Sequence, residues 1–330
     1  MGRYREADLS RLMVGSAADR PTRVSVADFA RPLDPAAAAA VIDSLPRQLA
    51  AEALRQVIER SARAHEQGRP IVVMCGGHVI KVGVSPCLIA LMERGLVTHL
   101  VLNGAAAIHD VEIARIGRTS EDVETNLHEG RFGMVDETGD FMNAAMSEGA
   151  ARDEGLGECW GRAVVDARAP HADVSLLAAA WRLGIPTTVH VAIGTDTIHH
   201  HPRCDGAALG ATTLRDFRVF AATLAEARGA VVLNFGSAVL LPEVFLKALS
   251  VARNLGADLS GLTTANFDQI QHYRPRVNLV ERPTRAPGAK GYSITGHHEI
   301  MVPLFAGALL ARVPSARASS AISAHAPDGR

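Results

Sequence analysis

The chain has 330 residues, 48 % of them hydrophobic, and its 34 Lys and Arg nearly balance 35 Asp and Glu. This length can bury a large core, and the near-neutral charge excludes the basic surface typical of nucleic-acid-binding proteins. There is no apolar run of membrane-spanning length, no signal-peptide core and no CxxC spacing among the four cysteines. We therefore expect a cytoplasmic protein that binds neither nucleic acid nor membranes.

The N-terminal part of the chain divides into an irregular segment and a regular one. Residues 1–45 are mixed and polar without a sustained period, and they predict an arm that wraps the domain or a neighbouring subunit. Residues 49–65 carry apolar side chains on one face and predict a helix. Residues 70–75 predict a buried strand that ends at Gly76-Gly77-His78, and Ser85-Pro86 opens a helix to about residue 95.

The middle of the chain continues this alternation. Residues 100–102 predict a strand ending at Asn103-Gly104, followed by a helix to about Ile116. Residues 123–168 are expected to be largely helical, and 172–183 to form an apolar helix. A strand is expected at 186–191, and it leads to Gly194-Thr195-Asp196.

The C-terminal part repeats the pattern once more. The expected elements are a helix at 213–228, a strand at 230–235 ending at Gly236-Ser237, a helix at 242–255, strands at 259–264 and 292–295, and a helix from His297 or His298 to about Leu310. The residues from Ser315 onward have the composition of disorder.

Strands and helices that alternate in this way predict an α/β fold. We expect a doubly wound, mostly parallel, Rossmann-like sheet in a single large domain over residues 46–312, with an N-terminal arm at 1–45 and a disordered tail at 313–330. In such a sheet the carboxyl ends of the strands share one edge, and ligands bind there. Small and polar residues end several of the predicted strands, which is compatible with a dinucleotide held by backbone N–H groups.

The segment from Val231 to Asp268 resembles the deoxyhypusine synthase family, in which a strand, a Gly-rich turn, a helix ending in Asn-Gly-Ala-Asp and a strand ending in Thr-Ala occur near Phe-Asp. The order also matches upstream. His78–Gly83 corresponds to the family's Asn-Leu-x-Ser-Ser-Gly, Asn103-Gly104-Ala105 to its Thr-Ala-Gly and Thr195-Asp196 to its Thr-Asp-Gly.

This resemblance covers roughly residues 70–310 and implies an NAD site and a homotetramer with active sites at subunit contacts. Motif matching implies that the cofactor is lined by Gly77, Asn103, Gly104, Asp196, Gly236, Ser237, Thr264, Ala265 and Asp268. The neighbouring residues Gly76, His78, Ala105, Thr195 and Asn266 complete the predicted cofactor-binding set.

The chain departs from that family at two positions of its catalytic machinery. Residues 281–285 read Glu-Arg-Pro-Thr-Arg where the family carries a catalytic lysine. Leu241-Pro242-Glu243 replaces the family's histidine pair. Deoxyhypusine synthesis itself is therefore not expected.

Residues 103–120 also resemble the NAD-dependent ornithine cyclodeaminase domain of LOR/SDH-like proteins, which has a Gly-Asn-Ala-x-Ala-x-His-Asp-Ile-Glu run. Both families oxidise an amine-bearing carbon to an imine with NAD. The combined resemblance implies an enzyme that acts on a diamine, a polyamine or a basic amino acid, with aminoalkyl transfer or deamination as the second step.

Five residues are candidates for the chemistry. Lys81 is one of only three lysines in the chain and follows a strand end, so it is a candidate nucleophile. His109 is a candidate proton acceptor, and Asp110 a candidate ligand for a substrate ammonium. His200 and His298 are candidate acid–base groups near strand ends.

Two alternatives remain from the sequence. A non-catalytic NAD-binding sensor would explain the missing lysine. A metal-dependent hydrolase could use His199–His201 with Cys204 and Asp205, but consecutive side chains diverge, so no metal ligand is predicted.

Overall fold

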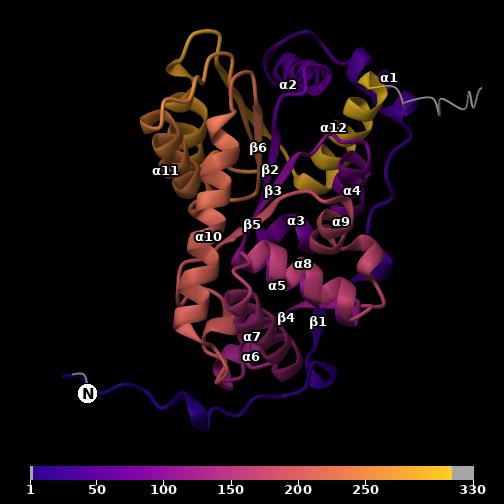
Figure 1. Cartoon of the computed structure of the whole chain (residues 1–330). Helices are drawn as coiled ribbons and strands as arrows, with labels where there is room; N and C mark the ends of the chain where they lie inside the picture. The colour runs from indigo at the N-terminus through magenta and orange to yellow at the C-terminus, as the bar shows by residue number, and fades with distance from the viewer. Residues whose placement is uncertain (1–2, 314–330) are drawn as a thin grey trace, which may run out of the picture.

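A computed structural model describes residues 3–313, and its centre is a parallel sheet of six strands (Figure 1). The strands are β2 (Ile71–Cys75), β3 (His99–Asn103), β5 (Thr187–His190), β6 (Val231–Phe235), β7 (Thr263–Asp268) and β8 (Lys290–Thr295). Their order across the sheet is β5-β3-β2-β6-β7-β8. Numbered along the chain, this is the order 3-2-1-4-5-6 of dinucleotide-binding folds. The expected doubly wound Rossmann-like α/β fold is confirmed.

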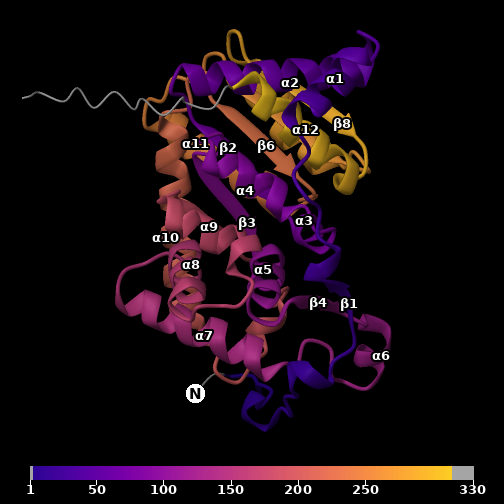
Figure 2. The ribbon, with the colours of Figure 1, turned by 90° about the vertical axis from the view of Figure 1, so that its right-hand side faces the viewer.

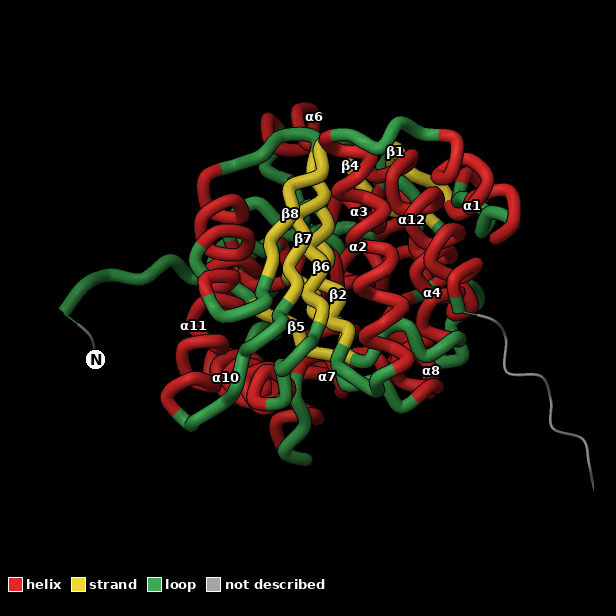
Figure 3. The backbone as a smooth tube through the Cα atoms, turned by 90° about the horizontal axis from the view of Figure 1, so that it is seen from above, coloured by secondary structure: helices red, strands yellow, loops and turns green. Residues whose placement is uncertain are grey.

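Helices cover both faces of the sheet, which explains why β2, β6 and β7 are buried at every position. One face carries α2 (Leu49–Glu66), α4 (Ser85–Glu93), α5 (Gly104–Ile116) and α12 (His298–Arg312), and the other carries α10 (Gly206–Ala225) and α11 (Leu240–Asn254). Figure 3 shows the sheet edge-on between these two layers. The short helix α3 (Gly77–Lys81) follows β2 directly.

A mainly helical layer packs beyond the β5 edge of the sheet (Figure 2). It consists of α6 (Val123–His128), α7 (Asp136–Ala151), α8 (Leu156–Asp166) and α9 (Leu176–Leu183). This agrees with the largely helical character expected of residues 123–168.

The N-terminal segment is more regular than its sequence predicts. Its strand β1 (Thr22–Ser25) pairs antiparallel with β4 (Arg118–Glu121), and its helix α1 (Pro35–Ser44) packs against α12. Asp34 caps α1, and Ala38 and Ile42 enter the main core. The sequence pattern did not reveal α1 because the five consecutive alanines at 36–40 give this helix only a weak apolar face.

Three expected elements have different bounds in the structure. The helix expected at 172–183 is split by Ser175, which caps α9, and α10 begins at Gly206 because Asp205 caps it there. The strand expected at 259–264 lies instead at Thr263–Asp268, since Thr263 N begins the ladder by donating to Ala230 O. The expected tail lies, except for Val313, outside the described residues. No helix within 3–313 has the length and apolarity of a membrane span.

Candidate functional site

The strand order places the point where the chain reverses its direction across the sheet between the carboxyl ends of β2 and β6, and folds of this class bind their ligands in a crevice at that point. Gly76 N donates to Phe235 O at 2.9 Å, and Gly236 N to Phe267 O at 3.2 Å, so the ladder continues past the strand ends. A Cβ on Gly76 would lie 2.3 Å from the Gly236 carbonyl oxygen. Only glycine permits this approach, and the floor of the crevice is therefore backbone.

His298 borders this crevice from the start of α12. Its side chain is buried, and its Nε2 donates to Phe267 O at 2.9 Å. In the neutral ring Nδ1 is then an acceptor, and it is buried without a hydrogen-bond partner among the described residues. His78 lies against it, with ring centroids 5.5 Å apart. Burial, followed by the neighbouring His298, lowers the pKa of His78.

A cavity of about 230 Å³ lies beside the crevice, above α5 and next to the loop that follows β5. Five predicted site residues line it: Lys81, Ala105, His109, Thr195 and Asp196. Gly77 connects the crevice with this cavity. It follows the end of β2, and a Cβ on it would lie 3.2 Å from Cδ2 of His109, which lines the cavity. The fold thus brings together predicted residues from three separate strand ends.

The hydrogen bonds of His109 fix which of its nitrogens faces the crevice. The Thr119 hydroxyl donates to Glu112 Oε2, so its oxygen accepts from His109 Nδ1 at 2.7 Å. The Nε2 nitrogen then carries the free lone pair, on the ring edge that faces Gly77. Burial, opposed by the charge of Glu112 and assisted by those of Lys81 and Arg20, lowers the His109 pKa to about 4. At neutral pH His109 is an uncharged base.

Glu112 is itself held by a buried cation from the N-terminal segment. Arg20 Nη2 donates to Glu112 Oε1 at 2.6 Å, and Arg20 Nη1 to Glu121 Oε1 at 3.2 Å. All three side chains are at least nine-tenths buried. Breaking one arm of such a pair is costly because it leaves an uncompensated buried charge. The N-terminal segment therefore helps to build the site within its own chain.

Asp196 occupies the other wall of the cavity, directly over the start of α5. A Cβ on Gly104 would lie 2.1 Å from Asp196 Oδ2, so glycine is required for this contact. The Asp196 side chain is 8 % exposed, and its Oδ2 is buried without a hydrogen-bond partner among the described residues. Burial raises the Asp196 pKa to about 6. An ammonium group of a ligand would satisfy this oxygen and favour its ionised form.

Lys81 ends α3 and is half-buried at the cavity wall. Within residues 3–313 its ammonium makes no ion pair or hydrogen bond. The other two lysines, Lys247 and Lys290, are each bonded to a neighbour. Lys81 is thus the lysine that remains available to a ligand.

Asp110 does not fit the substrate-binding role expected of it. It is fully buried on the opposite side of α5, where it accepts hydrogen bonds from Ser175 Oγ at 2.6 Å, Leu176 N at 2.8 Å and Leu177 N at 3.1 Å. Its carboxylate holds the start of α9. The helical period explains the error, since neighbours at i and i+1 point to different faces.

Three residues expected at the cofactor lie inside the sheet instead. Thr264, Ala265 and Asn266 are buried within β7, because that strand ends at Asp268 and not at Ala265. Asn266 pairs with Asn234 of β6 at 2.7 Å. Of the residues expected after this strand, only Asp268 stands at its carboxyl end.

The side chains of the consecutive histidines His199, His200 and His201 point in different directions. His199 Nδ1 accepts from Gly194 N at 3.1 Å, His200 Nε2 lies 3.2 Å from Gly133 O, and His201 Nε2 lies 3.2 Å from Asp136 Oδ1. His200 lines a neighbouring cavity of about 240 Å³ that also reaches Asp196. Within the described chain no three His, Cys, Asp or Glu side chains converge as metal ligands.

Sequence reasoning missed the groups behind His109. Glu112 lies one helical turn after His109 on α5 and belongs to the His-Asp-Ile-Glu run noted above, so its spacing carried a signal. No sequence signal marked Thr119, Glu121 or Arg20, because the pairing of β1 with β4 brings these residues together.

Two groups at the crevice fit a bound dinucleotide. The bare backbone of the Gly76 and Gly236 turns allows close approach, and the buried acceptor His298 Nδ1 lacks a donor that a ribose hydroxyl or a carboxamide would supply. Asn103 instead caps α5 by accepting from Ala106 N at 2.8 Å, and Ser237 Oγ accepts from Leu241 N in the first turn of α11 at 3.2 Å.

Comparisons with known proteins found no matching family model and no matching curated protein. Among solved structures, the chain is similar to ArgZ, an arginine dihydrolase from the ornithine-ammonia cycle in cyanobacteria, with 17 % identity, a TM-score of 0.48, and coverage of 78 % of this chain and 31 % of that one. A putative LOR/SDH protein from Methanococcus maripaludis has 15 % identity and a TM-score of 0.46, with 88 % and 73 % covered.

A putative deoxyhypusine synthase from Entamoeba histolytica has 10 % identity and a TM-score of 0.45, with 80 % of this chain and 88 % of that one covered. The chain spans about a third of the length of ArgZ and of AgrE, whose complex with ornithine and NAD+ is also similar to it.

Proposed function

We propose that this protein is an NAD-dependent enzyme that oxidises the amine-bearing carbon of a diamine, polyamine or basic amino acid to an imine. The observation that carries the proposal is the orientation of His109. Its unprotonated Nε2 faces the junction at Gly77, between the dinucleotide-type crevice and the cavity of Lys81 and Asp196.

NAD, when bound, would supply the hydride acceptor. His109 Nε2 would take a proton from the substrate ammonium, which leaves the neutral amine needed for oxidation. The buried Asp196 carboxylate would hold a second ammonium, the role first expected of Asp110. Glu112 and Thr119 would act as positioning residues, because they fix the tautomer of His109.

Lys81 would act in the second step. Its deprotonated Nζ would attack the iminium carbon, form a new C–N bond and release the original nitrogen as ammonia or as the departing amine. The result is a lysine-bound imine, ready for transfer or hydrolysis. This step needs a neutral amine, which arginine cannot supply.

The proposal is tested with purified protein, NAD+ and a panel of diamines, polyamines, ornithine, lysine and arginine. Absorbance at 340 nm reports net reduction, and borohydride followed by mass spectrometry reports a trapped imine. We expect at least one substrate to give either signal, and His109→Gln to lower the rate by about a hundredfold to ten-thousandfold. The control, His65→Gln at the opposite end of the sheet, should keep full activity.

Lys81→Arg separates charge from nucleophilicity. We expect this variant to fold, to bind NAD and to lose turnover by a factor on the order of a thousand. In the wild type, borohydride should label the peptide containing Lys81. Lys247→Arg, at an exposed lysine paired with Glu243, is the matched control and should change nothing. Full turnover in Lys81→Arg would reject the nucleophile role, and NAD binding without any substrate signal would favour the sensor.

A further inference from the structure

A second cavity lies at the opposite end of β5, away from the candidate site. Its volume is about 450 Å³, within the range of small-molecule sites, and it shares no lining residue with the cavities around Asp196. It is enclosed by the start of α8, the end of α9, the start of β5 and the middle of α10.

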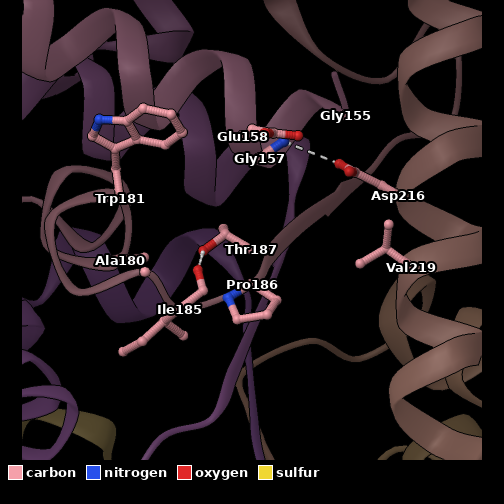
Figure 4. Close-up of a pocket in the computed structure, with 11 residues that line it drawn as sticks. Gly155, Gly157, Glu158, Ala180, Trp181, Ile185, Pro186, Thr187, Asp216 and Val219 are labelled. Atoms are coloured by element: carbon pink, nitrogen blue, oxygen red, sulfur yellow. Dashed lines mark hydrogen bonds between the residues drawn. The ribbon is translucent and has the colours of Figure 1, made fainter. Parts of the chain in front are cut away.

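One side of this cavity is apolar and carries an exposed indole. Figure 4 shows Trp181 on one side and Asp216 with Val219 on the other, and Ile185, Pro186 and Thr187 between them. Trp181 is 38 % exposed, whereas the other tryptophan, Trp160, is fully buried and bonded to Met142 O. An exposed tryptophan in a concave apolar wall is typical of a binding surface.

The ionisable side chains of this cavity are acids. Asp216 is buried, and its Oδ2 accepts from Val189 N at 2.7 Å and Gly157 N at 3.0 Å. Glu158 is exposed at the rim and has no ion-pair partner within residues 3–313. The lining contains neither lysine nor arginine nor histidine. A ligand anion would therefore find no counter-charge, and a ligand cation would find Glu158.

The two acids differ in what they offer a ligand. Burial, opposed by the hydrogen bonds from Val189 and Gly157 and assisted by the charge of Glu158, raises the Asp216 pKa to about 8. At neutral pH Asp216 is a neutral acid that needs no counter-ion, and Glu158 supplies the charge. The indole face adds an attraction for cations that is independent of both acids.

We propose that this cavity is a second binding site, for a small organic cation with an aromatic or aliphatic body packed on Trp181 and its positive nitrogen directed at Glu158. The site does not depend on the proposed oxidation. Its ligand class follows from the apolar wall, the unpaired rim carboxylate and the lack of lining cations.

The experiment uses benzamidine as the cationic probe, with neutral benzamide and anionic benzoate as close analogues. Tryptophan fluorescence is the readout, since Trp160 is shielded and Trp181 faces the cavity. We expect saturable quenching by benzamidine, with affinity about fivefold or more above that of benzamide, and no saturation with benzoate.

Variants locate the probe. Trp181→Phe should abolish the quenching, Val219→Trp should block binding as judged by calorimetry, and Glu158→Gln should lower benzamidine affinity about threefold to tenfold without affecting benzamide. Asp196→Asn should leave the titration unchanged, because Asp196 lies in the other cavity. Equal binding of the three probes, or full binding to both Val219→Trp and Glu158→Gln, would overturn the proposal.

Discussion

Replacing Asp216 by asparagine tests the structure through the pH dependence of stability. Asparagine keeps an oxygen that can accept from Val189 N and Gly157 N, but it cannot ionise. In the native protein, burial raises the Asp216 pKa from 3.8 to about 8. In the unfolded chain the same carboxyl ionises near its ordinary value of about 4.

The sign and size of the effect follow from linkage. Between these two pKa values the native state binds a proton that the unfolded state has lost, so raising the pH favours unfolding. The stability of the wild type should therefore fall relative to Asp216→Asn by up to about 1.4 kcal/mol for each pH unit from about pH 5 to pH 8. The difference should level off at higher pH, where both states are ionised. Across the roughly four pH units between the two pKa values, the total difference is on the order of 5–6 kcal/mol.

Urea unfolding at a series of fixed pH values measures this difference directly. Asp173→Asn, at an exposed carboxylate, is the matched control and should show no such trend above pH 5. The reasoning is refuted if the difference in the free energy of unfolding between the wild type and Asp216→Asn stays constant from pH 5 to pH 8. Asp216 would then be ionised throughout this range.

Three further outcomes are expected. Thr119→Val removes the hydroxyl that accepts from His109 and should lower kcat about tenfold to a hundredfold without changing the affinity for NADH. Thr119→Ser keeps the hydroxyl and should restore the rate. Steady-state kinetics measure kcat, and titrations with NADH measure the affinity. Asp110→Ala should lower the free energy of unfolding by about 3 kcal/mol or more, because three donors at the start of α9 lose their acceptor, while the affinity of the remaining folded protein for NADH stays normal. Light scattering at micromolar concentration should show a homotetramer, and a monomer would reject the oligomer that the family resemblance implies.

The fold could be predicted from the sequence because its signals are local. Short apolar runs such as Val72–Met74 and Val231–Leu233 are followed closely by a glycine or a polar residue. This pattern predicts strands of a buried parallel sheet. The bounds of the strand at Thr263–Asp268 were not predicted, because most of its residues are polar. Its Asn266 is tolerated only through the amide of Asn234 on the adjacent strand, which no local pattern reveals.

The candidate site could be predicted only in part, for a similar reason. Lys81, His109 and Asp196 follow strand ends, and parallel topology brings such residues to one edge. Arg20 comes from a segment without a recognisable period, and its place beside Glu112 depends on an antiparallel pairing of two short strands. Which of His109 and Asp110 faces the cavity depends on the helix phase at Gly104, which only the structure fixes.

The central claim is that a nicotinamide dinucleotide binds the crevice between β2 and β6, and one comparison of two glycine variants tests it. A Cβ on Gly236 would lie 2.9 Å from His298 Cε1, whereas a Cβ on Gly68 would meet nothing within 4 Å. Both glycines have left-handed backbone, with φ of +67° and +62°, so the backbone strain of an alanine is matched.

Calorimetric titration with NADH should give saturable binding to the wild type and to Gly68→Ala with affinities within about twofold, and binding to Gly236→Ala weaker by about tenfold or more. Absence of NADH binding to the wild type at millimolar concentration, or equal affinities for the two variants, would contradict the account.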